Sequence, residues 1–237
     1  MAGEAVSPAL RQGCLAVLSE PELARYANYK APAARDRYLL GRAMVRAVLS
    51  RQAAVPPGGW AFGASEHGRP HVVSPQLTPP LHFNLTHTHG LLALVVGGEA
   101  EIGIDAECIE RPRSVEAVAA NYFAPAEQAL LDAAPPAQRG AVFFDIWTLR
   151  EAYAKARGLG LALPLNSYHF GLDGDVARLE CGARCHDDAQ RWRFHRLRPT
   201  TRHVVAVAQA GSQVEVWPPA VHWLSEAELL VALQQTT

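Results

Sequence analysis

The segment Ile102-Gly103-Ile104-Asp105-Ala106-Glu107 constrains the fold most, because its apolar residues predict a buried strand that ends in two carboxylates. Alternate residues of a strand share a face, so Asp105 and Glu107 are expected to point the same way. Two like charges at that separation repel unless one is protonated, both reach water, or a cation lies between them. A divalent cation such as Mg2+ would fit, since it binds one or two carboxylates together with water and phosphate oxygens. A strand that simply enters a polar loop is the alternative.

The composition is that of an ordinary globular protein. The chain has 237 residues, 49% of them hydrophobic, which is enough for one large core or two packed halves. Its 22 basic and 23 acidic side chains give no general reason to expect a nucleic acid or a membrane as partner. No signal sequence and no bilayer-length apolar run is visible, so the expected location is the cytoplasm. Cys181, Cys185 and His186 lack a fourth ligand for a zinc site.

Hydrophobic spacing predicts helix followed by strands, twice along the chain. The first helix is expected over residues 23–52, and the second over residues 137–157, where Gly158 would end it. Strand patterns follow the first helix at 60–62, 71–73, 81–87, 91–96 and 99–104, and the second at 167–170, 176–179, 191–197 and 203–208. Short helices are expected at 115–123 and 126–131. This order predicts an α+β fold of two similar halves, although no residue-level repeat is visible.

Three further motifs carry polar groups that suit a phosphate. Glu151 and Lys155 are four residues apart and share a helix face; this is a common surface ion pair, but the flanking residues are too apolar for an exposed helix. Thr86-His87 at a strand end could hydrogen-bond a phosphate or could be polar surface. Arg69 in its Gly-Arg-Pro turn is, by itself, most often a solvated charge.

Together these motifs resemble the signature of the 4'-phosphopantetheinyl transferases, which move the phosphopantetheine arm of coenzyme A to a serine of a carrier protein. The family pattern is apolar-Gly-apolar-Asp-x-Glu followed by Trp-x-x-Lys-Glu-Ala/Ser-x-x-Lys, here residues 102–107 and 147–155. Residues 68–70 and 83–88 resemble two upstream elements in the same order. Arg150 replaces the usual Lys, and Thr86 and Thr88 replace Ser. The resemblance weakens before residue 35 and after about residue 213.

The length resembles that of the larger branch, typified by the activator of surfactin synthetase, which implies a monomer whose two halves form a pseudo-dimer. Each half would be a long helix packed on a mainly antiparallel sheet. Residues 1–104 would form the adenosine and 3'-phosphate side of the coenzyme A site, and residues 105–213 the metal and pyrophosphate side. Residues 214–237 would be an extension of unknown role.

The resemblance also implies the site residues. Asp105, Glu107 and Glu151 would bind Mg2+, with Mn2+ as the alternative metal. Lys155 would contact the pyrophosphate of coenzyme A, and Glu151 or a metal-bound water would accept the serine proton. The adenosine 3'-phosphate end would be bound by Arg37, Arg69, Thr86 and His87.

The implied partners are coenzyme A and an apo acyl, peptidyl or aryl carrier protein from fatty-acid, polyketide or nonribosomal peptide synthesis. Arg111, Arg113 and residues 122–123 are the candidates for carrier docking. Two other classes remain open at this point. A Mg2+-dependent nuclease would also use acidic residues and a Lys, but the chain has no long basic face. A non-catalytic module that binds coenzyme A or a carrier would not need the carboxylates and Lys155.

Overall fold

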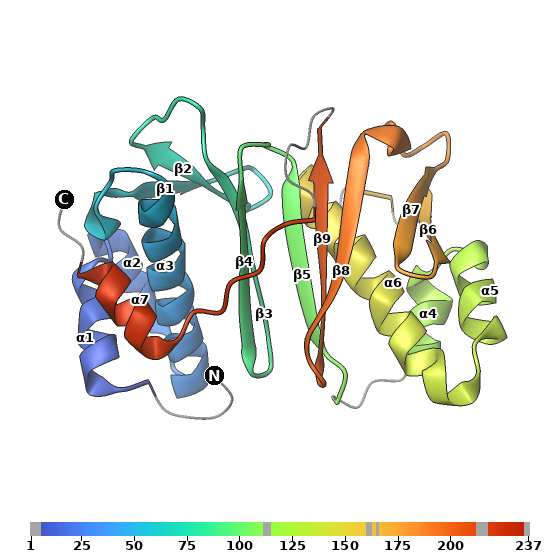
Figure 1. The fold of residues 1–237 in the computed structure, drawn as a ribbon, viewed down its shortest axis with the longest axis horizontal. Helices are drawn as coiled ribbons and strands as arrows, with labels where there is room; N and C mark the ends of the chain where they lie inside the picture. The colour runs from blue at the N-terminus through green and yellow to red at the C-terminus, as the bar shows by residue number, and fades with distance from the viewer. Residues whose placement is uncertain (1–5, 111–114, 160–162, 165, 212–217, 235–237) are drawn as a thin grey trace.

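Two groups of helices and strands lie side by side in the computed structural model, each with one long helix (Figure 1). The structure describes residues 6–110, 115–159, 163–164, 166–211 and 218–234. Every strand pairing within these residues is antiparallel. The predicted α+β class is therefore confirmed. None of the helices in the described ranges is long and apolar enough to cross a membrane.

The N-terminal group packs its helices against two hairpins, β1-β2 and β3-β4. Its elements are α1 (Pro8–Ala16), α2 (Glu20–Asn28), α3 (Pro32–Gln52), η1 (Pro57–Gly59), β1 (Ala61–Ala64), β2 (Pro70–Ser74), β3 (His82–Thr88) and β4 (Leu91–Gly97). The prediction of one helix over 23–52 is wrong, because α2 ends at Asn28 and α3 begins at Pro32. Proline disfavours helical backbone in the residue before it but is well suited to begin a helix.

The C-terminal group is built on a three-stranded sheet in the order β5-β9-β8, with the hairpin β6-β7 beside it. Its elements are β5 (Ile102–Cys108), α4 (Val115–Tyr122), α5 (Pro125–Ala133), α6 (Pro136–Arg157), β6 (Tyr168–Asp173), β7 (Val176–Cys181), η3 (Ala189–Arg191), β8 (Trp192–Thr200) and β9 (His203–Ala210). The long helix was predicted correctly, and Gly158 ends it in the left-handed conformation at φ 64.

Strand β5 differs from its prediction in position. It was expected to end before the carboxylates, but pairing with β9 continues to Cys108, so Asp105 and Glu107 lie within the strand. The carboxylates are tolerated there because other side chains bond to them, as described below. The predicted boundary after residue 104 falls inside β5, and the division into domains stays a prediction.

A buried ion pair links α2 to α3 in the N-terminal group. Arg46 is 1% exposed and pairs with Glu22, which lies in the first turn of α2. The guanidinium also donates to the carbonyl oxygen of Trp60 over 2.8 Å and lies 5.0 Å from the ring of Phe62 in β1. A buried charge needs such partners, so this pair fixes α3 relative to α2 and β1.

The C-terminal group repeats this arrangement. Arg150 of α6 pairs with the fully buried Glu127 in the first turn of α5, with 2.7 Å between Nη1 and Oε2. Its guanidinium lies 4.6 Å from the ring of Tyr168, at the start of β6. An offset of 104 residues relates both the prolines that begin the long helices, 32 and 136, and the two arginines, 46 and 150. This repeat was not predicted from the sequence, and it supports the prediction of two similar halves; the symmetry of a pseudo-dimer stays a prediction.

Side chains of β3 join the two groups where they meet. Asn84 Oδ1 accepts a hydrogen bond from the Ile104 backbone N–H over 3.0 Å, and Thr88 Oγ1 accepts one from the Cys108 N–H over 3.1 Å. These β3 residues share a face because they are an even number of positions apart. Strand β3 thus lies along β5, although the two strands belong to different sheets.

The C-terminal extension crosses back to the N-terminal group (Figure 1). Its helix α7 (Glu226–Leu233) buries Leu229, Ala232 and Leu233 in one cluster with residues of α1 and α3. The described part of this extension therefore belongs to the core of the N-terminal group.

Candidate active site

Helix α6 lies directly against β5 at Gly103. A Cβ atom at this position would be 2.1 Å from the carbonyl oxygen of Ala152 and 2.6 Å from the backbone nitrogen of Ala156. Only glycine permits this approach, which explains the glycine of the motif. Because Asp105 and Glu107 share the strand face of Gly103, both carboxylates are directed toward the helix.

Asp105 is buried and bonded by residues of two other elements. Its side chain Oδ1 lies 2.6 Å from Lys155 Nζ of α6 and accepts a 3.3 Å hydrogen bond from Thr86 Oγ1 of β3. Lys155 Nζ also donates to Thr86 Oγ1 over 3.1 Å. The second oxygen, Oδ2, is buried without a hydrogen-bond partner among the described residues. A carboxylate oxygen in that state is a candidate for binding a cation.

The environment of Asp105 favours its protonated form. Burial raises the pKa of this carboxyl to about 6, although the Lys155 ammonium acts in the opposite direction. The nearby charges of Glu151 and Glu107 raise the pKa further. The three predicted metal ligands therefore interact electrostatically, and a positive charge among them would be favourable.

The other two acidic side chains come from the same two elements. Trp147 Nε1 of α6 donates a 3.2 Å hydrogen bond to Glu107 Oε1, which orients this carboxylate. Trp147, Glu151 and Lys155 share a face of α6 because they follow one another at four-residue spacing. Across the residues that the structure describes, no three acidic, histidine or cysteine side chains are arranged as a ready metal site. The unpartnered Asp105 Oδ2 and the mutual repulsion fit a cation, and the ligand set stays a prediction.

Thr86 and His87 lie on opposite faces of β3, and their predicted contacts with coenzyme A stay a prediction. Thr86 is 4% exposed and faces Asp105, whereas His87 is exposed. Burial lowers the pKa of His87, and the charges of Arg37 and Lys155 lower it further. Arg37, His87 and Lys155 therefore form a basic cluster beside the acidic site, with Arg37 exposed on α3.

Arg69 lies apart from this cluster. It lowers the pKa of His82 in addition to the effect of burial, which places it near the other end of β3 from His87. Its guanidinium bonds three backbone carbonyl oxygens of the C-terminal group. The predicted contact of Arg69 with the adenosine end of coenzyme A stays a prediction.

The structure also shows what Arg150 does in place of the usual Lys. Its charge is committed to the buried pair with Glu127, so it stabilises the packing of α5 on α6. Sequence reasoning missed Glu127. A signal was present, because a Glu three residues after a helix N-cap position commonly bonds back to the backbone, as Glu127 Oε2 does to the Ala124 N–H over 2.9 Å.

Two apolar side chains near the acidic site in sequence or space are exposed. Tyr122 is 44% exposed and contacts the ring of Trp147 edge to face at 5.8 Å, and Ile109, just beyond β5, is 40% exposed. Phe123, which was predicted together with Tyr122 for docking, is instead buried and stacks on Phe143. Arg111 and Arg113 lie outside the described residues.

The fold and the site define a class that comparison with known proteins identifies. A sequence model described as "4'-phosphopantetheinyl transferase superfamily" matches residues 101–208. The protein "4'-phosphopantetheinyl transferase HetI" of Nostoc sp. (strain PCC 7120) is 34% identical over 201 residues, which cover 84% of this chain and 81% of the relative. The chain therefore belongs to the 4'-phosphopantetheinyl transferase superfamily, a family of enzymes, and the predicted resemblance is confirmed.

Two further relatives extend the match to other bacteria. The protein "4'-phosphopantetheinyl transferase Sfp" of Bacillus subtilis (strain 168) is 32% identical over 174 residues, 68% of this chain and 75% of the relative. The protein "4'-phosphopantetheinyl transferase AcpT" of Escherichia coli (strain K12) is 36% identical over 151 residues, 62% and 71% of the two chains. The family model covers all the predicted residues of the acidic site, which are Asp105, Glu107, Glu151 and Lys155.

Proposed function

We propose that this protein transfers the 4'-phosphopantetheine arm of coenzyme A to a serine of an apo carrier protein and releases 3',5'-ADP. The observation that carries the proposal is the contact between α6 and β5, which holds Lys155 Nζ 2.6 Å from the buried Asp105 and brings Glu107 and Glu151 into the same electrostatic environment. These residues match the signature by which the sequence resembles the superfamily, to which the chain belongs. The sequence favours a location in the cytoplasm, and the resemblance to the larger branch implies a monomer.

We infer that Asp105, Glu107 and Glu151 hold Mg2+. The unpartnered Asp105 Oδ2 and the raised pKa of Asp105 support this inference, because both indicate a site that favours added positive charge. When bound, the ion would neutralise charge that develops on the phosphate oxygens during transfer.

The chain's own residues would position and activate the reactants. Lys155 would bind the pyrophosphate through its ammonium group. This group lies on the same face of α6 as Glu151. In the transfer, the serine Oγ forms a bond to the β-phosphorus while the bond from that phosphorus to the bridging oxygen of the pyrophosphate breaks. The serine proton must leave at the same time, and Glu151, half-buried on α6, is the proposed acceptor.

Arg37 and His87 of the basic cluster would bind the adenosine 3'-phosphate. Both are exposed, and His87 lies on the face of β3 opposite to Thr86. The lowered pKa of His87 favours a neutral ring, which would donate a hydrogen bond, while Arg37 would supply the charge. A charge-assisted contact of this kind contributes on the order of 1.5 to 3 kcal/mol.

The carrier would dock on the exposed side chains of Tyr122 and Ile109. The ring of Tyr122 contacts Trp147, whose indole bonds Glu107, so a carrier seated there would present its serine to the acidic site. Carrier proteins are generally acidic around that serine, and Arg111 and Arg113 are the basic residues predicted to meet them.

The test is a transfer assay with purified protein, coenzyme A, Mg2+ and several apo carriers. Mass spectrometry should show that one phosphopantetheine arm is added to a carrier, and that a carrier whose serine is replaced by alanine gains none. We expect Asp105→Ala to abolish transfer at any Mg2+ concentration. Absence of transfer to every carrier would refute the proposal, and full activity of Asp105→Ala would refute the role of Asp105.

A further inference from the structure

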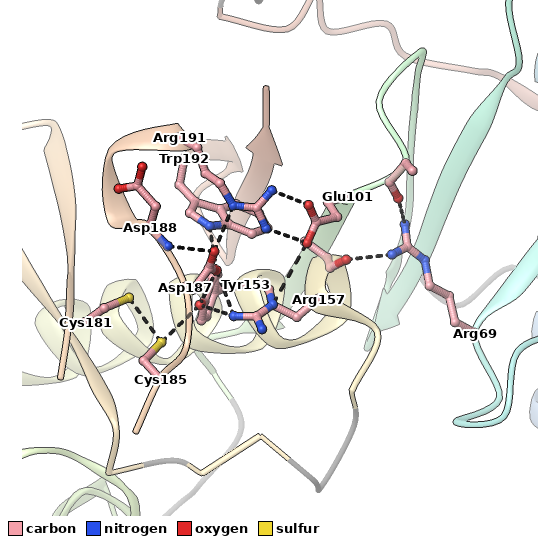
Figure 2. A network of polar contacts seen from close by, with 12 residues as sticks. Arg69, Glu101, Tyr153, Arg157, Cys181, Cys185, Asp187, Asp188, Arg191 and Trp192 are labelled. Carbon is pink, nitrogen blue, oxygen red and sulfur yellow. Dashed lines mark hydrogen bonds and ion pairs between the residues drawn. The ribbon is translucent and has the colours of Figure 1, made fainter. Parts of the chain in front are cut away.

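Arg69 connects the turn between β1 and β2 to the ends of both elements that carry the acidic site. Its Nη1 donates to the carbonyl oxygen of Ala156, in the last turn of α6, over 2.6 Å. Its Nη2 donates to the carbonyl oxygens of Ala100 and Ile102, before and at the start of β5, over 2.9 and 2.7 Å. Figure 2 shows Arg69 beside Glu101, next to the network that surrounds the end of α6.

The end of α6 needs such a partner. The last carbonyl groups of a helix have no acceptor role within the helix, and they carry the negative end of its dipole, which a cation stabilises. The Arg69 side chain also packs against Gly158, where an added Cβ would lie 3.5 Å from Arg69 Cδ. Burial lowers the pKa of Arg69, and Glu101 partly offsets this effect. The three carbonyl bonds compensate for the loss of water around the guanidinium.

The position of Arg69 allows it to control the geometry of the acidic site. Ala156 directly follows Lys155, and Ile102 lies three residues before Asp105 on β5. The backbones of α6 and β5 are already in contact at Gly103, so a shift of the helix end would change the distance between Lys155 Nζ and Asp105 Oδ1. Reacting groups displaced by about 1 Å can cost as much as 100-fold in rate.

The same contacts argue against a phosphate as the partner of Arg69. Both terminal nitrogens of its guanidinium are bonded to backbone oxygens. Its electrostatic effect is on His82, whereas the basic cluster affects His87 at the other end of β3. Five residues of strand separate the two histidines by about 17 Å.

We propose that Arg69 is a positioning residue that fixes the end of α6 on the start of β5, and so holds Lys155 against Asp105, rather than a ligand of the adenosine 3'-phosphate. The kinetic part of this inference rests on the proposed transferase function. The structural part, the tie between α6 and β5, does not.

The experiment compares Arg69→Lys and Arg69→Ala with Arg37→Ala. Lysine keeps the charge of Arg69 but is a single point donor that cannot bond the helix and the strand together. We therefore expect both Arg69 variants to lose about 10- to 100-fold in kcat. Their preference for coenzyme A over its dephospho form should be unchanged. Arg37→Ala should instead lose that preference, because Arg37 is proposed to contact the 3'-phosphate.

A readout besides activity separates positioning from a general loss of stability. Hydrogen exchange should become faster in peptides from the last turn of α6 and the start of β5. Arg157→Ala is the matched variant, since Arg157 ties the same helix end to Asp187 over 2.7 Å. Its replacement should also give faster hydrogen exchange at this end of α6.

Two results would overturn the proposal. One is an Arg69→Lys variant with the kcat of the unmodified protein, and the other is a loss of preference for coenzyme A in Arg69→Ala equal to that of Arg37→Ala. If Arg69→Ala does not fold, Arg69→Lys and Arg69→Gln decide. If the unmodified protein transfers no arm, the proposed function fails, and hydrogen exchange still tests the tie between α6 and β5.

Discussion

Replacing Asp105 by Asn should stabilise the protein at neutral pH while abolishing transfer. The pKa of Asp105 is about 6 in the folded protein, against 3.8 for an ordinary aspartate, so folding is opposed by the charged form. The difference between these two pKa values corresponds to about 3 kcal/mol of folding free energy. Asn can still accept the hydrogen bond of Lys155 but carries no buried charge.

The stability gained by Asp105→Asn should depend on pH. Below pH 3.8 the carboxyl is protonated in both the folded and unfolded states, so it does not lower the free energy of unfolding through a buried charge. As the pH rises toward 6, the unfolded state releases its proton first, so the folded state loses stability over this interval. Asp105→Asn should therefore differ little from the unmodified protein at pH 4 and be more stable by up to about 3 kcal/mol at pH 8.

Urea denaturation at several pH values measures this difference, with Asp132→Asn as the control because Asp132 is an exposed acidic residue. A stability difference that is the same at pH 4 and pH 8 would refute the electrostatic reasoning. Added Mg2+ extends the test. At about 100 times its Kd, a bound ion should stabilise the unmodified protein at pH 8 by about 2.7 kcal/mol and should stabilise Asp105→Asn much less.

Three further predictions concern other parts of the structure. Gly103→Ala should lower the free energy of unfolding by about 1 to 3 kcal/mol, measured by urea denaturation, because its methyl group would collide with the backbone of α6. Glu127→Gln and Glu22→Gln should each cost about 3 to 5 kcal/mol in the same assay, because each leaves a buried arginine without its ion-pair partner, and unequal effects would argue against equivalent roles. His87→Ala should weaken the binding of coenzyme A in calorimetry but not that of its dephospho form; equal weakening of both would contradict its role at the 3'-phosphate.

Local signals in the sequence were sufficient for the long elements. The spacing of apolar residues and the glycine at position 158 predicted α6 because periodicity and a left-handed end are local properties. Pro32 is a local signal for the break between α2 and α3, but the prediction of one helix over 23–52 did not take this proline into account. Helix α7 was missed although Ser225 and Glu228 form a capping box at its start.

The arrangement of side chains around the site depends on contacts between distant segments, so the sequence alone could not predict it. The motif placed Asp105 and Glu107 on one strand face, but only pairing with β9 shows that they lie within β5. Arg69 bonds backbone carbonyl oxygens rather than another side chain. Every residue has such an oxygen, so no sequence pattern identifies these partners. Thr86 is predicted at the adenosine end of coenzyme A, and its hydrogen bond to Asp105 could not be read from the sequence.

The repeat between the two halves also explains how only one of them carries the acidic site. With the offset of 104 residues that relates the two buried arginines, the α6 face of Trp147, Glu151 and Lys155 corresponds to Ala43, Ala47 and Arg51 of α3. In the N-terminal half this face is closed, because Ala43 and Ala47 are buried in one cluster with Leu229, Ala232 and Leu233 of α7. Arg51 Nη2 also lies 3.5 Å from the carbonyl oxygen of Glu228.

Helix α7 therefore occupies the surface that corresponds to the proposed catalytic face of α6, and its role should be structural. We expect Leu229→Ala, at a side chain that is 5% exposed, to lower the free energy of unfolding by about 2 to 5 kcal/mol. Under conditions where the variant is fully folded, kcat and the KM for coenzyme A should be unchanged, because the described residues of α1 and α3 that cluster with α7 are not among the proposed site residues. Val231→Ala is the matched control, since Val231 of the same helix is 60% exposed and should cost little. A folded Leu229→Ala variant with impaired transfer would show that α7 takes part in function, and the correspondence between the two helix faces would then not account for its position.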